Sequence, residues 1–362
     1  MTLKALTVTG YRSIQRVNVP LGQITVAVGE NGVGKTNLYR GLVLLQAAAT
    51  GRLPATLADE GGFASALWAG RRRKGPVRMI FEATWDDLAY RLELGLPQPP
   101  NPFPLDPVIK VETISVPEVK AVLAERGNGS AFVRDENGDR VVYPFDLWPS
   151  ESMLTQILDP RRLPILTDIR GRLLDWRTYH QVRTDADSPL RMAKTGCFTP
   201  VMSADGSDLA AALATIVEIG DRDALAETID RAFGGSRLII DRDSRGQFLV
   251  MLERPGLQRA LSPAELSDGT LRYLALAAAL LSPRPPELMA INEPETSLHS
   301  ELLDPLAVLI RRAARRTQVW VTTHSTRLSV GLGQRGETEG SLGETVSLDV
   351  TMTDGQTHVS CC

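Results

Sequence analysis

Cysteine is scarce in this sequence. Three cysteines occur among 362 residues, Cys197, Cys361 and Cys362, and the last two are adjacent. Neither a disulfide framework nor a set of metal ligands can be built from this spacing, which is typical of a reducing compartment.

Long apolar segments are also missing. The most apolar run, residues 271–281, contains Arg272 and is too short to span a bilayer. The first residues, MTLKALTVTGYRS, lack an apolar core of the length found in signal peptides. No heptad run is long enough for an extended coiled-coil arm. We therefore expect a soluble, cytoplasmic protein without membrane insertion.

Charge of one sign does not dominate the chain. The net charge is −3, and 43% hydrophobic with 23% charged residues is typical of a folded globular protein. This balance argues against a surface coated in basic residues for nucleic acid, although a local basic patch depends on distribution rather than on the sum. The basic run Arg71-Arg72-Arg73-Lys74 can contact a phosphate backbone or form a solvated loop.

Strand-like and helix-like segments alternate, which favours an α/β fold. Strands are predicted at residues 3–8, 17–21, 24–28, 77–84, 88–94, 108–115, 121–125, 131–134, 140–143, 237–241, 247–252, 288–291 and 319–323. The clearest helices are predicted at 36–49, 166–179, 209–219, after Ser267, and at 299–315. We expect an N-terminal lobe (1–149), a helical insertion (150–235) and a C-terminal lobe (236–362).

A phosphate-binding loop is predicted between the strand 24–28 and the helix that follows. The pattern G-x-x-x-x-G-K-[ST] is formed by Gly29, Glu30, Asn31, Gly32, Val33, Gly34, Lys35 and Thr36, and Asn37 comes next. Glycines let the backbone turn its N–H groups toward phosphate oxygens, and the helix N-terminus adds a positive dipole end. Lys35 is then expected to bridge the β- and γ-phosphates of ATP, and the Thr36 hydroxyl to bind Mg²⁺.

An acidic segment follows the apolar strand 288–291 and has the form of a Walker B motif, Asn-Glu-Pro-Glu. Asn292 stands where an Asp normally supports magnesium, and its amide oxygen can accept from a metal-bound water but brings no charge. Glu293 is the candidate to orient or deprotonate the attacking water. A strand ending in solvated acids is the alternative, and the phosphate-binding loop favours the functional interpretation.

Two further motifs carry candidate ligand contacts. Ser267 and Gly269, in Leu-Ser-Asp-Gly-Thr before the apolar helix, offer a hydroxyl and free N–H groups to an anion, although a plain N-cap uses the same residue types. Their position shortly before the acidic strand favours an ABC signature. His324 ends the strand 319–323, where a parallel sheet binds ligands, so we expect it to donate a hydrogen bond to the γ-phosphate.

The order of these motifs resembles the ABC-type ATPase heads of the SMC/RecF group, and in particular its compact members without long coiled coils. The resemblance covers residues 1–95 and 236–330. It implies a P-loop NTPase head of the α/β class with a mixed β-sheet and a helical insertion. It also implies ATP hydrolysis with ATP and Mg²⁺ as ligands, and Lys35, Glu293 and His324 as catalytic residues.

The resemblance implies further contacts. Two heads would dimerise head to tail, so that Ser267 and Gly269 of one contact the γ-phosphate held by Lys35 of the other. Arg12, in Gly-Tyr-Arg-Ser, would reach a phosphate, and Tyr11 beside it would pack near the base. Gln156 would be the metal-sensing glutamine, although glutamines are common on helix surfaces.

Three functions share this chemistry. The resemblance implies a cytosolic ATPase that acts on DNA in repair, genome maintenance or defence against foreign DNA. The ATPase subunit of a membrane transporter is the second, and the Ser-Asp-Gly signature, the Thr-His pair and the long middle region argue against it. The third is a regulatory module whose ATP-driven dimerisation controls a separate effector protein.

Overall fold

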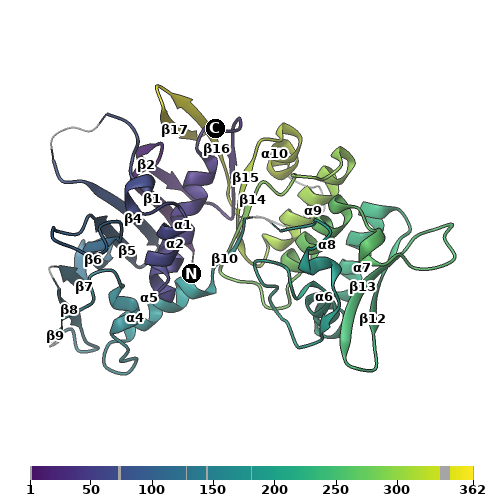
Figure 1. Ribbon diagram of the computed structural model, residues 1–362, viewed down its shortest axis with the longest axis horizontal. Helices are drawn as coiled ribbons and strands as arrows, with labels where there is room; N and C mark the ends of the chain where they lie inside the picture. The colour runs from purple at the N-terminus through teal and green to yellow at the C-terminus, as the bar shows by residue number, and fades with distance from the viewer. Residues whose placement is uncertain are drawn as a thin grey trace. The chain divides into compact units, whose positions relative to one another are not determined.

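The structure is a computed structural model that describes residues 2–71, 75–127, 129–143, 146–180, 182–334 and 343–361. The chain forms two compact units (Figure 1). Unit 1 comprises Met1–Gly22, Gly29–Trp176 and Leu348–Cys362, and unit 2 comprises Gln23–Val28 and Arg177–Ser347. These boundaries differ from the predicted division at 149/150 and 235/236. Long-range strand pairing sets them, and such pairing leaves no mark in local composition.

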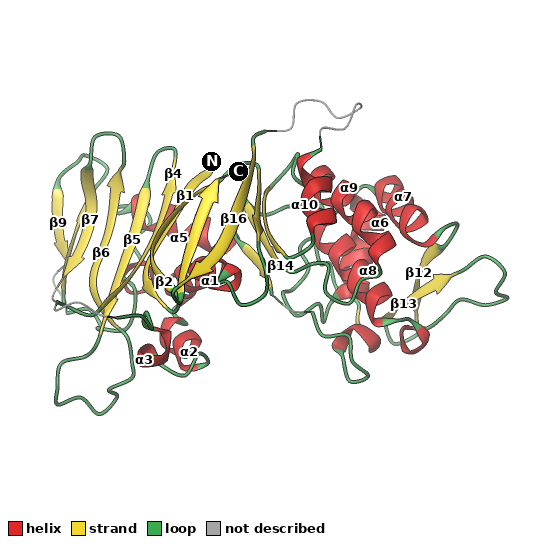
Figure 2. Cartoon of the chain, turned by 90° about the horizontal axis from the view of Figure 1, so that it is seen from above, coloured by secondary structure: helices red, strands yellow, loops and turns green. Residues whose placement is uncertain are grey.

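Unit 1 contains an antiparallel sheet of eight strands, ordered β2-β1-β4-β5-β6-β7-β8-β9 (Figure 2). The strands are β1 Leu3–Tyr11, β2 Ile14–Pro20, β4 Arg78–Trp85, β5 Ala89–Gly95, β6 Val108–Val116, β7 Ala121–Gly127, β8 Ser130–Arg134 and β9 Arg140–Tyr143. Burial alternates strictly along β4, as expected for a strand with one face in the core. The strands predicted here are confirmed to within a few residues at each end.

The helices of unit 1 are α1 Lys35–Thr50, α2 Leu53–Ala58, α3 Phe63–Ala66, α4 Met153–Gln156 and α5 Pro164–Asp175. Helix α1 packs against β1 and β4, and Gly41 lets it approach closely: a Cβ there would lie 3.0 Å from Val8 Cγ2. A hairpin near the C-terminus, β16 (Thr345–Thr353) with β17 (Gln356–Cys361), was not predicted from the sequence.

Unit 2 contains four parallel strands in the order β10-β14-β15-β3. They are β10 Arg177–Tyr179, β14 Leu288–Asn292, β15 Gln318–Thr323 and β3 Ile24–Val28. Every residue of β14 and β15 is buried, and this burial explains the apolar runs 288–291 and 319–321 within them. The predicted helix 166–179 is wrong at its end, because α5 stops at Asp175 and the next residues pair with β14.

Five α-helices are described in unit 2: α6 Leu209–Ile219, α7 Arg222–Phe233, α8 Asp268–Leu280, α9 Leu303–Ala313 and α10 Thr326–Gly333. A second sheet has the order β11-β13-β12, formed by Lys194–Thr195, Gln247–Glu253 and Arg237–Arg242. Short 3₁₀ turns occur at Pro189–Arg191, Pro263–Glu265 and Ser300–Leu302.

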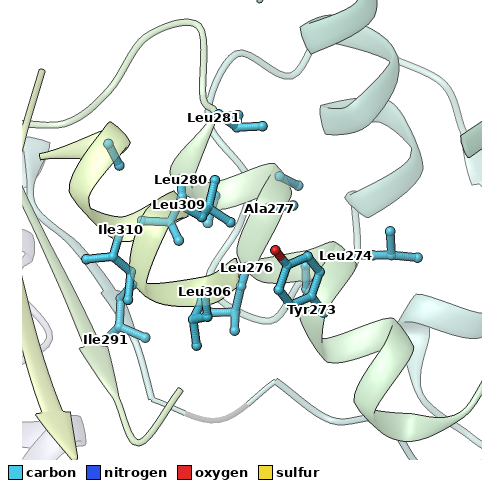
Figure 3. Close-up of a cluster of buried hydrophobic side chains, with 14 of the residues drawn as sticks. Tyr273, Leu274, Leu276, Ala277, Leu280, Leu281, Ile291, Leu306, Leu309 and Ile310 are labelled. Carbon is cyan, nitrogen blue, oxygen red and sulfur yellow. The ribbon is translucent and has the colours of Figure 1, made fainter. Parts of the chain in front are cut away.

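The core of unit 2 surrounds helix α8. Apolar side chains of α8, such as Leu276 and Leu280, pack with Leu306 and Ile310 of α9 and with Ile291 of β14 (Figure 3). Each of these five side chains is at most 4% exposed, so α8 is apolar because it is enclosed within the unit. Among the described residues, no helix is both long enough and apolar enough to cross a bilayer.

Candidate functional site

The predicted phosphate-binding loop begins at Gly29, the first residue of the second segment of unit 1, and leads into helix α1. Gly32 and Gly34 have φ of 85° and 103°, a left-handed backbone that other L-residues rarely adopt. Gly34 is the N-cap of α1, so no side chain caps this helix, and its first turn contains no acidic residue. The free N–H groups of an uncapped helix N-terminus form a site for an anion.

Lys35 and Thr36 begin α1 at this site. Lys35 is only 3% exposed, and its Nζ lies 2.7 Å from both the Gly29 and Glu30 carbonyl oxygens, so the ammonium is held over the loop. Within the described part of the chain, the half-buried Thr36 hydroxyl has no hydrogen-bond partner. An open helix end, a fixed ammonium and an available hydroxyl fit the phosphates of a nucleotide and its metal ion.

A chain of hydroxyl groups braces the loop. Asn37 Nδ2 donates to Ser13 Oγ at 2.8 Å, Ser13 lies 2.7 Å from Thr357 Oγ1, and Thr357 donates to the Val33 carbonyl at 2.8 Å. A Cβ on Gly34 would lie 2.1 Å from Thr357 Oγ1. Sequence analysis missed Ser13 and Thr357 as supports of this loop, since Thr357 is 324 residues from Val33 and belongs to no motif.

Arg12 is engaged by a carboxylate instead of standing free for a phosphate. Its Nη2 lies 2.8 Å from Glu60 Oε2, and Arg40 binds the other oxygen at 2.7 Å. The Tyr11 hydroxyl also donates to Glu60, at 2.6 Å, while its fully buried ring packs on Phe81. The expectation that Tyr11 packs near a base is therefore wrong, because its ring belongs to the core of unit 1.

The structure contradicts Gln156 as a metal-sensing residue. Its amide oxygen accepts from Trp148 N at 2.7 Å, and its amide nitrogen donates to the Glu151 carbonyl at 2.8 Å, so both ends close a local loop. The neighbouring Thr155 lies beside Gly51, the C-cap of α1. The 16 residues of α1 separate this end from Thr36 by about 24 Å.

In unit 2, Asn292 and Glu293 stand where β14 ends. Asn292 is 7% exposed, and its Oδ1 accepts from the Thr322 hydroxyl at 2.7 Å, which leaves one lone pair of the amide oxygen. Glu293 has a left-handed φ of 45°, and its N–H donates to the Thr322 carbonyl at 2.9 Å. A strained, non-glycine conformation fixed by neighbouring groups is a feature that clusters at active sites.

The ends of β14 and β15 also bring Glu295 and His324 together. His324 Nδ1 lies 3.1 Å from Glu295 Oε1, and 43% of the histidine side chain is exposed. The sequence analysis singled out His324 but not Glu295. The repeated acid in Asn-Glu-Pro-Glu was the available signal.

Arg272 links helix α8 to the same strand end. It is 7% exposed, and its Nη2 donates to the Glu293 carbonyl at 3.1 Å. Burial lowers the pKa of this guanidinium, and the charges of Glu295 and Glu293 oppose that effect. The catalytic candidate Glu293 is thus tied to the helix that begins at the predicted signature.

The predicted signature lines a groove of about 860 Å³ at the N-terminus of α8. Ser267 is the N-cap and accepts from Thr270 N at 3.2 Å, while Gly269 packs so closely that a Cβ would lie 2.6 Å from the Ser297 carbonyl. Sequence analysis did not single out two other groove residues, Arg254 and His299. The Arg254 side chain is exposed and has no hydrogen-bond or ion-pair partner among the described residues. It therefore gives the groove a free positive charge.

The basic run 71–74 falls partly outside the described residues. Of the basic run 71–74, only Arg71 is described, and it is exposed. Strand β10, which was not predicted, pairs Tyr179 with Ile291 and so brings His180 next to the end of β14. The residue that follows, Gln181, lies outside the described residues.

Comparison with known proteins decides the family. Residues 24–330 match the family model described as "AAA domain, putative AbiEii toxin, Type IV TA system". The chain belongs to this family. The family assignment covers both units and all the motifs that follow β3. No curated protein matches the chain in a sequence search.

Solved structures of SMC heads share the fold of this AAA-domain protein. One is an Smc head bound to the C-winged helix domain of ScpA, with 15% identity and a TM-score of 0.57, covering 100% of this chain and 98% of that one. Pyrococcus furiosus and Pyrococcus yayanosii heads give 15% and 11% identity and TM-scores of 0.53 and 0.52. They cover 100% and 99% of this chain, and 96% and 97% of theirs. The predicted SMC/RecF-like, ABC-type P-loop NTPase fold is confirmed.

Proposed function

We propose that this AAA-domain protein binds and hydrolyses ATP with Mg²⁺, and that two copies associate head to tail around the nucleotide. The observation that carries the proposal is the uncapped N-terminus of α1 with Lys35 held over its loop. The N–H groups of a helix N-terminus attract phosphate oxygens, and a fixed ammonium beside them adds a charge-assisted contact.

The residues divide the chemistry between them. Residues 29–37 hold the phosphates, with Lys35 as the point charge on the β- and γ-oxygens and Arg12 as a further cation that leaves Glu60. Glu293 accepts the proton of the attacking water or orients that water, and His324 contacts the terminal phosphate. Mg²⁺, when bound, neutralises phosphate charge, and Thr36 with Asn292 would hold it.

The groove at the signature supports the dimer. It combines the N-terminus of α8 and the free charge of Arg254, which suit an anion, but it is broad and open to solvent. Such a surface suits a phosphate that is presented by a second copy of the chain. It suits a free nucleotide less well. Ser267 and Gly269 would then contact the γ-phosphate held by the partner's Lys35.

The family description bears on the biological setting. We infer a cytoplasmic role in DNA repair, genome maintenance or defence against foreign DNA, and the family description as a toxin of a toxin–antitoxin system favours defence, with a separate effector protein as a partner. The test is to measure the rate of ATP hydrolysis with and without double-stranded, single-stranded and nicked DNA. A rate that changes with DNA would show that the protein responds to it.

Lys35→Ala tests the nucleotide site. Loss of a charge-assisted contact to phosphate costs about 1.5–3 kcal/mol, so ATP affinity measured by calorimetry should fall about 10- to 100-fold. Lys194→Ala is the matched control, because Lys194 is an exposed lysine in the short strand β11. Equal affinities in the parent and Lys35→Ala would exclude the site.

A further inference from the structure

Glu295 is a buried carboxylate to which the proposed chemistry gives no role. Its side chain is 5% exposed, and two hydrogen-bond donors and one imidazole nitrogen converge on one oxygen, Oε1. They are the Thr323 hydroxyl at 2.6 Å, the His324 backbone N–H at 2.8 Å and His324 Nδ1 at 3.1 Å. All three groups belong to Thr323 and His324, at the end of β15.

The other oxygen, Oε2, is buried and has no hydrogen-bond partner among the described residues. Burying a carboxylate is costly, and leaving one oxygen unsatisfied adds to that cost. A neutral glutamine would accept from Thr323 and the His324 N–H at lower cost. Two neighbours benefit from this charge: the buried Arg272 guanidinium, on which Glu295 acts electrostatically, and the imidazole of His324, which lies 3.1 Å from Oε1.

The position of Glu295 favours one of the two ring nitrogens of His324 as the site of the proton. A carboxylate oxygen 3.1 Å from Nδ1 favours a proton on Nδ1, and this form leaves Nε2 for a ligand. In other proteins a carboxylate behind a functional histidine fixes its orientation and tautomer in the same way.

We infer that Glu295 is a positioning residue that holds His324 in the Nδ1–H form, with Nε2 presented to the reacting phosphate. This inference rests on the proposed role of His324 in ATP hydrolysis. The structure contains a contrasting pair, His299 and Glu301, whose side chains are 72% and 85% exposed with Nδ1 3.7 Å from Oε2. An exposed pair at that distance is not expected to fix a tautomer.

Glu295→Gln tests the inference, with Glu218→Gln as the matched control, because Glu218 is an exposed acid paired with Arg242 at the surface of the same unit. Nitrogen-15 NMR of the four histidine rings reports the tautomer, with His324→Ala assigning the signal. In the parent we expect His324 to be Nδ1–H. In Glu295→Gln that preference should weaken, while the His299 signal stays unchanged.

The same variant should lose activity without losing ATP affinity. Removing a partner behind a functional ligand typically costs 10–100-fold, so kcat for ATP hydrolysis should fall by about that factor with KM within about twofold. The thermal midpoint should not fall, because a neutral amide replaces a buried charge.

Two results would overturn the inference: Nε2–H as the main form in the parent, or a fall in kcat with an unchanged His324 signal. The second result would mean that Glu295 acts only by supporting the fold. If the parent hydrolyses no ATP, the proposed function fails, yet the NMR measurement still tests the Glu295–His324 pair.

Discussion

Asn292 shows how one residue can alter the chemistry at a strand end. The sequence pattern predicts that it stands in place of the Asp of a Walker B motif, and its buried amide oxygen already accepts from Thr322. One lone pair of the amide oxygen remains to accept a hydrogen bond from a metal-bound water. The neutral amide carries no charge that would attract the metal ion. We therefore expect weak support for Mg²⁺ from this side of the site.

Asn292→Asp should lower the Mg²⁺ concentration that gives half-maximal ATP hydrolysis. A new unit charge near the metal contributes about 1 kcal/mol even in a water-like medium, which corresponds to about fivefold. Repulsion between the new carboxylate and Glu293 opposes this gain, and bound Mg²⁺ reduces that repulsion. The measurement is a magnesium titration at saturating ATP.

Asn18→Asp is the matched control for that titration. Asn18 is exposed, and it also accepts from a threonine hydroxyl, Thr7, at 3.0 Å. Coincident magnesium curves for the parent and Asn292→Asp would mean that Asn292 does not support the metal.

At the scale of elements, the hairpin β16–β17 matters because it supports the phosphate-binding loop of unit 1. Thr357 N donates to the Ser13 carbonyl at 2.8 Å, and the Thr357 hydroxyl donates to Val33 O. The hairpin thus joins the β1–β2 turn to the loop through one residue. The shape of the loop depends on these contacts as well as on its own glycines.

Thr357→Val should weaken nucleotide binding without abolishing it. The variant keeps the shape of the side chain but removes the donor to Val33 and the acceptor for Ser13, at about 1 kcal/mol per hydrogen bond. ATP affinity by calorimetry should fall about 5- to 30-fold, the range for the loss of one or both bonds. Thr351→Val, an exposed position on β16, should bind as the parent does. Unchanged affinity in Thr357→Val would show that the loop keeps its shape without the hairpin.

At the scale of the whole molecule, the proposed dimer predicts that blocking hydrolysis traps two copies together. Glu293→Gln removes the base but leaves the residues that bind phosphate, so ATP should bind while hydrolysis falls about 100-fold or more. The γ-phosphate then persists, and light scattering with ATP should show a stable dimer that the parent forms only transiently. Hydrolysis at the parental rate would remove Glu293 from this role.

Mixing two inactive variants tests whether the dimer is head to tail. Lys35→Ala lacks a working phosphate loop, and Ser267→Arg lacks a working signature. In a mixed head-to-tail dimer one site has both intact parts, so roughly a quarter of the parental activity should return. No recovery, with mixed dimers verified by a tag on one variant, would argue against a shared site.

The sequence by itself determined the parts of this protein that are contiguous. The strand–loop–helix around residues 29–36 was predictable because glycine conformation, helix start and phosphate chemistry are all set within a dozen residues. The strands β14 and β15 were predictable because strands buried on both faces carry apolar runs, here 288–291 and 319–321. Together with the order of the motifs, these features were enough to identify the fold.

Only the tertiary structure decided which distant residues meet. Strand β10 has three residues and gains its conformation by pairing with β14, so local pattern assigned it to a helix. Gln156 matched an expected residue type, but the length of α1 separates it from the phosphate loop. Thr357 beside Val33, Glu60 on Arg12 and Glu295 on His324 depend on strand register and on packing between segments far apart in the chain. Such contacts follow from the closing of a whole core, which no window of sequence contains.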